Sequence, residues 1–225
     1  MLIVLEGLDG SGKSTQVKML TSYLKNRGIK TNYLHFPRFD APVFGELIAK
    51  FLRGDFGSID QVHPQLVALL FAEDRKDASK KINNWLVNNH CVILDRYVYS
   101  NVAFQCSKLK NQEEINSLRE WILATEYNQF AIPKPNLNLF LDVPIKFVDS
   151  KLKNARNGND RAYLDGRPDI HESNINFQLK VRDIYMEQCN KDKNFIRIDC
   201  SDKSGDMLTT NNIFEKIKNE VEKII

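Results

Sequence analysis

The amino-terminal segment combines three glycines, a lysine and two serines at a spacing that could do chemistry. It reads G-L-D-G-S-G-K-S and fits G-x-x-x-x-G-K-[ST], directly after an apolar run and directly before a helical pattern. The glycines let successive N–H groups face phosphate oxygens, and the helix adds its positive dipole end. Lys13 would reach the β and γ phosphates, and Ser14 would give its hydroxyl to Mg²⁺. A glycine-rich turn beside a surface lysine is the alternative, and the strand and helix context disfavours it. The expected ATP-binding residues are Gly7, Leu8, Asp9, Gly10, Ser11, Gly12, Lys13, Ser14 and Thr15.

A carboxylate and a guanidinium follow another apolar run. Asp95 and Arg96 come directly after residues 91–94, at a strand end of the kind where ligands of open α/β sheets gather. Asp95 can hold the Mg²⁺ shell, and the planar fork of Arg96 suits a second phosphate group, although a structural ion pair would also explain an arginine there. Arg38 and Arg75 add two further cations. Together these residues indicate an anionic acceptor.

Short apolar runs alternate with helical patterns, and this alternation predicts the elements that position these side chains. The runs lie at residues 2–6, 33–36, 91–94, 137–141 and 195–198; helical patterns lie at 13–26, 43–52, 64–87, about 144–154, about 172–189 and from 213 to the end. We expect a P-loop NTPase fold of the α/β class, a three-layer αβα arrangement with a five-stranded parallel sheet and a short lid. With no internal repeat or linker, residues 1–225 are predicted to form a single domain.

Composition and charge exclude several other classes. The chain has 225 residues, of which 42% are hydrophobic and 27% charged, as in ordinary globular proteins. Its net charge of +3 is too small to indicate nucleic acid or an anionic membrane surface as a partner. No apolar run approaches the ~18 residues that span a bilayer, and the opening segment reads as neither a signal peptide nor an anchor. The four cysteines form no CxxC pair, so we expect reduced thiols and a cytoplasmic location.

The phosphate loop leaves the reaction open. GTPases need a base-reading N-K-x-D motif, and the nearest approach, at residues 190–193, ends in lysine. The chain is also short for a motor or a multi-domain ATPase. Small kinases are therefore the predicted class.

Four segments match the motifs of a known family of enzymes. They are residues 6–16, 36–38, 70–75 and 95–105, and the last fits D-R-Y-x-x-S-x-x-A-[YF]. On these segments the sequence resembles the thymidylate kinases of the nucleoside monophosphate kinase group, from residue 2 to about 185. The last motif separates it from adenylate, shikimate and deoxynucleoside kinases. The resemblance implies transfer of the ATP γ-phosphate to dTMP, with Mg²⁺, giving dTDP for DNA precursor synthesis, and it also implies a homodimer.

The resemblance also implies an acceptor site. Phe71 would stack on the thymine ring, although by its setting alone it would be a core residue, and Arg75 would hydrogen-bond the edge of the base. Asn101 and Gln105 would lie near the base, and Phe104 would crowd the sugar C2′ and disfavour a ribose hydroxyl. The implied dTMP-binding residues are Asp9, Phe36, Arg38, Phe71, Arg75, Arg96, Ser100, Asn101, Phe104 and Gln105. Within this set, Asp9 would lie near the sugar 3′-hydroxyl and the metal waters.

Catalysis should consist of positioning and charge neutralisation. The acceptor is a phosphate monoester with a second pKa of about 6, so it is mostly a dianionic nucleophile at neutral pH and needs no general base. Two highly charged anions must then be brought in line. Lys13 and Mg²⁺ would serve the donor, and Arg38 and Arg96 the acceptor phosphate. Ser14 and Asp95 are the expected metal ligands.

A basic segment is the predicted lid, at about residues 151–170. Residues 151–167 hold five basic and two acidic side chains with little apolar content, although a solvated surface loop has the same composition. The phosphate loop contains no arginine, so the resemblance implies that the lid supplies one. Arg161 and Arg156 are the candidates, with Arg161 preferred and Arg167 a third choice. The expected catalytic residues are thus Lys13, Arg96, Asp9, Arg161 and Arg156.

Two other functions compete with this interpretation. The first is a different nucleotide kinase, acting on UMP, CMP or a deoxynucleoside. Phe71, Arg75 and Phe104 argue against it, because an enzyme for ribonucleotides should tolerate the 2′-hydroxyl. The second is a regulatory or assembly protein that uses the loop as a switch, which would bind ATP without phosphorylating any monophosphate.

Overall fold

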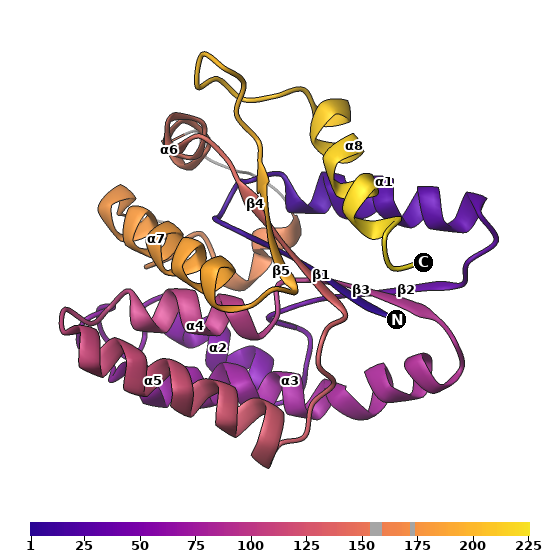
Figure 1. The fold of residues 1–225 in the computed structure, drawn as a ribbon. Helices are drawn as coiled ribbons and strands as arrows, with labels where there is room; N and C mark the ends of the chain where they lie inside the picture. The colour runs from indigo at the N-terminus through magenta and orange to yellow at the C-terminus, as the bar shows by residue number, and fades with distance from the viewer. Residues whose placement is uncertain (154–158, 172–173) are drawn as a thin grey trace.

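The computed structural model describes residues 1–153, 159–171 and 174–225, and side chains 151–161 lie outside that description. A five-stranded sheet in the order β2-β3-β1-β4-β5 forms its centre (Figure 1). The strands are β1 (Leu2–Gly7), β2 (Thr31–His35), β3 (Cys91–Asp95), β4 (Leu137–Asp142) and β5 (Phe195–Asp199). Every pairing is parallel. Strands β1, β3 and β4 are buried along their whole length, which is why they read as continuous apolar runs. The predicted parallel sheet is confirmed.

Helices cover both faces of the sheet. Figure 1 shows α1 (Lys13–Asn26) and α8 (Thr210–Val221) on one side, and α3 (Pro64–Val87), α4 (Val98–Cys106), α5 (Gln112–Ala124) and α7 (Ile175–Lys191) on the other. Helix α6 (Ile145–Lys153) follows β4. Two short helices complete the set, a π-helical turn at Thr125–Gln129 and a 3₁₀ helix at Asn159–Leu164. This arrangement confirms the predicted αβα fold.

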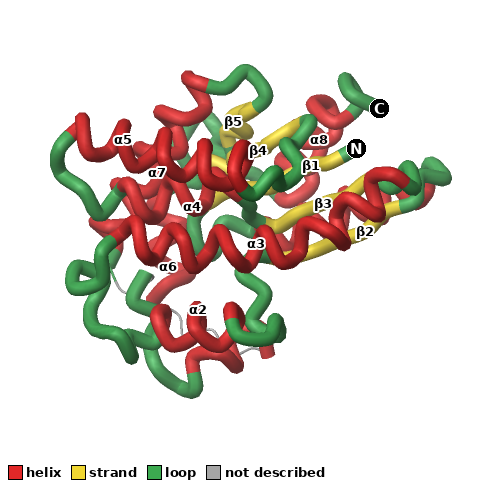
Figure 2. Tube along the Cα trace, turned by 90° about the horizontal axis from the view of Figure 1, so that it is seen from below, coloured by secondary structure: helices red, strands yellow, loops and turns green. Residues whose placement is uncertain are grey.

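A second, smaller core supports the region beyond the sheet. Helix α2 (Phe44–Leu52) packs on α3 through a cluster formed by Ile48, Phe51, Leu52 and Val67. Figure 2 shows α3 running beside β2 and β3, with α2 beyond the strands. Leu70 and Phe71 of α3 also pack against this cluster.

Several helix boundaries are set by caps. Pro64 is the first residue of α3, a position at which proline is common. The side chain of the preceding His63 accepts a hydrogen bond from Gln65 N and so caps the helix. Helix α7 begins at Ile175 rather than at about 172, because the side chain of Asn174 accepts hydrogen bonds from the first-turn N–H groups. The structure also adds α5, which the sequence patterns did not predict.

None of the helices in the described ranges is both long and apolar enough to cross a membrane. All four cysteines are unpaired thiols.

Candidate active site

The phosphate loop joins β1 to α1 at the carboxyl edge of the sheet. Gly10 and Gly12 have φ values of 77° and 85°, a left-handed conformation that glycine adopts without a steric penalty. The N–H groups of Thr15 and Gln16 donate to Gly12 O, whereas the N–H groups before them, at the start of α1, have no acceptor within the helix and can face an anion. Lys13 is buried and folds back over the loop, donating to Leu8 O at 2.9 Å and to Gly7 O at 3.3 Å. The loop is thus formed as the sequence predicts.

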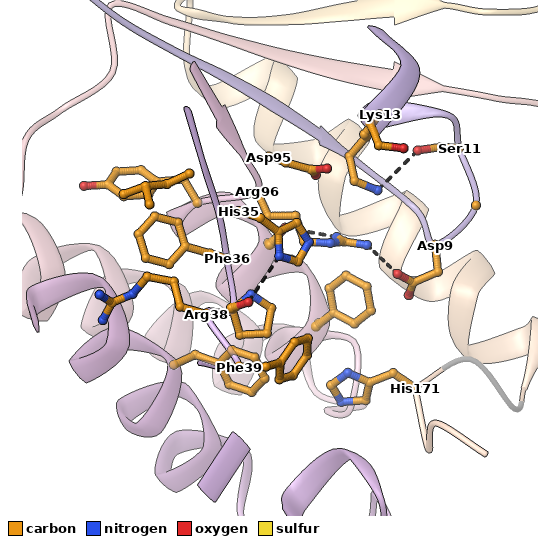
Figure 3. Close-up of a pocket in the computed structure, with 18 of the residues that line it drawn as sticks. Asp9, Ser11, Lys13, His35, Phe36, Arg38, Phe39, Asp95, Arg96 and His171 are labelled. Atoms are coloured by element: carbon orange, nitrogen blue, oxygen red, sulfur yellow. Dashed lines mark hydrogen bonds and ion pairs between the residues drawn. The ribbon is translucent and has the colours of Figure 1, made fainter. Parts of the chain in front are cut away.

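Arg96 occupies the neighbouring strand end and holds the loop carboxylate. Its backbone has φ 68°, which costs a non-glycine residue on the order of 1 kcal/mol. Its Nη2 donates to Asp9 Oδ1 at 2.6 Å and its Nη1 to Ser100 Oγ at 3.1 Å. The guanidinium also lies 5.0 Å from the ring centroid of Phe104. Figure 3 shows it directed at Asp9. The structure therefore brings Asp9, Arg96, Ser100 and Phe104 together, as expected.

The fully buried carboxylate of Glu6 holds Ser100, one member of this cluster, in place. Glu6 accepts hydrogen bonds from Tyr97 N at 2.9 Å, from Ser100 N at 3.1 Å and from Tyr185 Oη at 3.0 Å, and it also contacts Ser100 Oγ. Burial raises the pKa of Glu6 above its usual value, and these hydrogen bonds oppose the rise. Glu6 was not among the site residues predicted from the sequence. The signal was available, since an acidic residue in an otherwise apolar buried strand needs partners.

The candidate metal ligands lie beside the loop. Asp95 is buried, lines the cavity and has an Oδ1 atom without a hydrogen-bond partner. Ser14 also lines the cavity, at the second residue of α1. No group of three or more acidic, histidine or cysteine side chains in the described ranges could hold a metal by itself. A carboxylate oxygen without a partner and a hydroxyl in the same cavity fit Mg²⁺, which prefers oxygen ligands and usually takes the rest from water and substrate phosphates.

At the other end of the cavity, Arg75 forms a buried ion pair. Its Nε and Nη2 donate to the two carboxylate oxygens of Glu126, at 2.5 and 2.7 Å, and both side chains are almost completely buried. Asn101 Nδ2 donates to Glu126 Oε1 and to Ala68 O, each at 2.9 Å, so its Oδ1 is left buried without a partner. Arg75 and Asn101 were predicted from the sequence, whereas Glu126, which lies in the π-helical turn, was not.

The remaining predicted acceptor residues line the same cavity. Phe36, Phe71 and Gln105 all do so. Phe71 is half-buried, with its edge against Phe51 at 6.4 Å between ring centroids. Gln105 Oε1 accepts a hydrogen bond from Lys108 Nζ at 2.7 Å. These placements agree with an aromatic and polar wall for a base.

Arg38 is the residue that the structure does not bring to the predicted phosphate position. It lines the cavity, but its guanidinium is bound to α3, where Nε donates to Asp74 Oδ1 at 2.8 Å and Nη2 to Asp77 Oδ2 at 2.6 Å. Figure 3 shows it pointing away from Arg96. Its role as a phosphate ligand stays a prediction.

The lid candidates fall only partly within the described residues. Arg156 lies outside them, and for Arg161 the structure describes the backbone, in the 3₁₀ helix, but not the side chain. Arg167 Nη1 donates to Asp55 Oδ1 at 2.5 Å, just after α2. From the described part of the predicted lid, Ala162, Tyr163 and Asp169 line the cavity, and so does His171, directly after the predicted lid. The choice between Arg156 and Arg161 therefore stays a prediction.

The cavity and its two positively charged side chains, Lys13 and Arg96, define a class of protein. The cavity has a volume of about 1220 Å³ and extends from the phosphate loop to Arg75, enough for two ligands of ordinary size. The doubly wound parallel sheet carries a phosphate loop with a buried arginine, Arg96, beside it. These are the features of a P-loop phosphotransferase of the nucleotide kinase class.

Comparison with known proteins identifies the family. The family model described as thymidylate kinase matches residues 5–210, and the chain belongs to this family. It is 30% identical to the thymidylate kinase of Plasmodium falciparum over 222 residues, which cover 99% of this chain and 90% of that protein. It is 31% identical to that of Mycobacterium tuberculosis over 189 residues, covering 83% and 85% of the two chains.

A solved structure gives the same result. The thymidylate kinase of Candida albicans superimposes with a TM-score of 0.74 at 26% identity, covering 99% of this chain and 91% of that one. The resemblance and the fold that the sequence predicted are confirmed. The reaction of the family is the phosphorylation of dTMP to dTDP, and membership gives this chain that enzymatic activity.

Proposed function

We propose that one kinase domain, residues 1–225, transfers the γ-phosphoryl group of ATP, bound with Mg²⁺, to dTMP inside this cavity. The observation that carries the proposal is a pair of positively charged side chains, Lys13 and Arg96, on one wall of the cavity. Lys13 serves the donor, while Arg96, held by Asp9 and Ser100, serves the acceptor. Two phosphate-binding groups side by side suit a reaction whose difficulty is to bring two anions together.

The chemistry needs charge neutralisation more than proton transfer. Lys13 and the N–H groups of the loop hold the donor phosphates, and Arg96 holds the acceptor phosphate, so the dianionic oxygen can attack in line. Mg²⁺, held by Ser14 with Asp95 in its shell, would add positive charge at the transferring group. An arginine of the lid, Arg161 or Arg156, would complete the set.

The base end has a fixed pattern of donors and acceptors. Because Glu126 takes Nε and Nη2 of Arg75, the Nη1 group is left to donate to a ligand. Because Asn101 Nδ2 is engaged, its Oδ1 is left to accept. A donor beside an acceptor matches the O4 and N3–H of thymine and mismatches cytosine, which has an amino group and a bare N3 there. Phe71 would stack on the ring, and Phe104 would exclude a 2′-hydroxyl.

The test is a comparison of phosphate acceptors. The purified protein is mixed with ATP and Mg²⁺, and release of ADP is followed with dTMP, dUMP, UMP, CMP and thymidine in parallel. We expect strong preference for dTMP over UMP and CMP. Turnover of UMP or thymidine in its place would assign a neighbouring kinase activity, and ATP binding without any acceptor-dependent turnover would support the switch function.

Binding of ATP to the free protein should depend on the ionisation of Lys13. Burial, and then the positive charge of Arg96, lower the pKa of Lys13 to about 8, while Asp95 and Asp9 oppose the shift. Only the protonated amine attracts phosphate, so ATP affinity should be constant below pH 8 and fall by up to about tenfold per pH unit above it. Equilibrium binding between pH 7 and 9.5 measures this, and a flat profile would contradict it. Burial also lowers the pKa of Lys108, to about 7, so Lys108→Met is the control that removes a second side-chain amine titrating near this range.

A homodimer and a cytoplasmic location are also part of the proposal. Leu66 and Leu69 on α3 are 65% and 37% exposed, and this apolar face of the helix would form the contact between subunits. We expect Leu66→Glu to shift the protein towards monomer in sedimentation equilibrium, whereas Lys80→Glu on the same helix should not. If the wild-type protein sediments as a monomer, the dimer is wrong. The unpaired thiols of the four cysteines agree with a reducing compartment.

A further inference from the structure

His171 is a buried imidazole in the wall of the cavity to which no role has yet been given. It is 6% exposed and lines the cavity. Three phenylalanine rings surround it, Phe51, Phe104 and Phe177, at centroid distances of 5.5, 5.1 and 5.5 Å. Among the described residues its Nε2 has no hydrogen-bond partner. A buried polar atom without a partner is costly, which points to a group supplied by a ligand.

The imidazole is neutral in this setting. Burial lowers the pKa of His171 well below its usual value, the positive charges of Lys108 and Arg96 lower it further, and Asp9 opposes them only in part. A neutral imidazole carries one N–H donor and one acceptor nitrogen. Nε2 is the nitrogen without a partner, and it is the donor or the acceptor according to which nitrogen carries the proton. A hydroxyl can both donate and accept, so it suits either case.

His171 lies on the same side of the cavity as Asp9. Gln178 joins the two, since its Nε2 is 2.8 Å from His171 O and 3.4 Å from Asp9 Oδ2. Arg96, which is bound to Asp9, lies over the ring of Phe104, and Phe104 in turn packs on His171. Figure 3 shows Asp9 and His171 on one side of the cavity and Arg38 on the other.

The acceptor offers only one free sugar hydroxyl for this position. In dTMP the 5′-oxygen carries the phosphate and C2′ carries none, which leaves the 3′-hydroxyl. We propose that the Nε2–H of His171 donates a hydrogen bond to the 3′-hydroxyl of dTMP, the hydroxyl near which the family resemblance already places Asp9. This inference rests on the proposed function. It makes His171 a specificity-determining residue that favours nucleotides with a free 3′-hydroxyl.

A cycle of variant and substrate isolates the contact. The values of kcat/KM for dTMP and for its 3′-deoxy analogue are measured with the wild-type protein and with His171→Phe, which keeps an aromatic ring among the three phenylalanines but removes both nitrogens. The variant should lose about fivefold to tenfold with dTMP, the size of one hydrogen bond, and almost nothing with the 3′-deoxy analogue. The preference for the hydroxyl therefore shrinks. Equal losses with both substrates, or no loss, would overturn the proposal.

Two further variants separate binding from packing. Phe177→Leu loosens the same ring cluster from a position that does not line the cavity, and it should leave the ratio of the two substrates unchanged. His171→Gln keeps an N–H donor and should retain part of the preference, so it serves if His171→Phe does not fold. If the wild-type protein does not phosphorylate dTMP, the proposed function fails; if it does and the cycle shows no coupling, only the role of His171 fails.

Discussion

Arg96→Ala is expected to lower kcat with dTMP by about 10²- to 10³-fold while leaving the affinity for ATP almost unchanged. The guanidinium is held in a buried position by Asp9 and Ser100, so its charge is available to the acceptor phosphate at no cost of reorganisation. The donor, by contrast, is assigned in our proposal to the loop and Lys13. Steady-state kinetics and equilibrium binding of ATP, measured on the same preparation, separate the two effects.

Two controls make this result specific. Arg96→Lys keeps the charge but loses the planar fork, so its kcat should lie between those of the wild type and the alanine variant. Arg119 is another buried arginine, paired with Glu187 at 2.6 Å and outside the lining of the cavity. Arg119→Ala should therefore lower stability and leave kcat unchanged. If Arg96→Ala weakened ATP binding by the same factor as kcat, the assignment of Arg96 to the acceptor would be wrong.

Local patterns were enough to predict the sheet and the phosphate loop. Strands β1, β3 and β4 are buried on both faces, so their apolar runs stand out, and the loop has its chemistry within eight consecutive residues. Helix α5 was missed although Ile115, Leu118 and Ile122 have helical spacing and are buried. That signal was present in the sequence, but the helix carries no site residue that would have drawn attention to it.

The partners of the charged side chains could not be predicted in the same way. Arg75 and its carboxylate Glu126 are 51 residues apart, and nothing in the local sequence links them. Arg38 was assigned to a phosphate from its type and position, whereas the structure pairs it with Asp74 and Asp77, which lie 36 and 39 residues away. A motif identifies which positively charged side chains are near the ligand. Only the fold determines which of their N–H donors already have a partner within the protein.

In the proposed site, Glu126 determines which polar atoms of Arg75 and Asn101 remain for the base. Its carboxylate takes two donors of Arg75 and one of Asn101, and only the other polar atoms of those two side chains are left to bind a ligand. Glu126→Gln has the same shape, but its amide must turn an NH₂ group towards one of these donors, and the substitution removes the charge that is paired directly with the buried guanidinium. We expect the free energy of unfolding to fall by about 3–5 kcal/mol and KM for dTMP to rise more than kcat falls.

Selectivity for the base is the readout that separates this role from a loss of stability. The ratio of kcat/KM for dTMP to that for dCMP should fall in Glu126→Gln, because the donor and acceptor atoms are no longer held in one order. Glu187→Gln is the matched control, since it removes a carboxylate from Arg119, another buried arginine, and should lower stability with the ratio unchanged. If Glu126→Gln does not fold, the wild-type protein tests the same geometry with N3-methylated dTMP, which cannot donate to Asn101 Oδ1 and should be a poor substrate. Efficient turnover of that analogue would show that this pattern does not read the base.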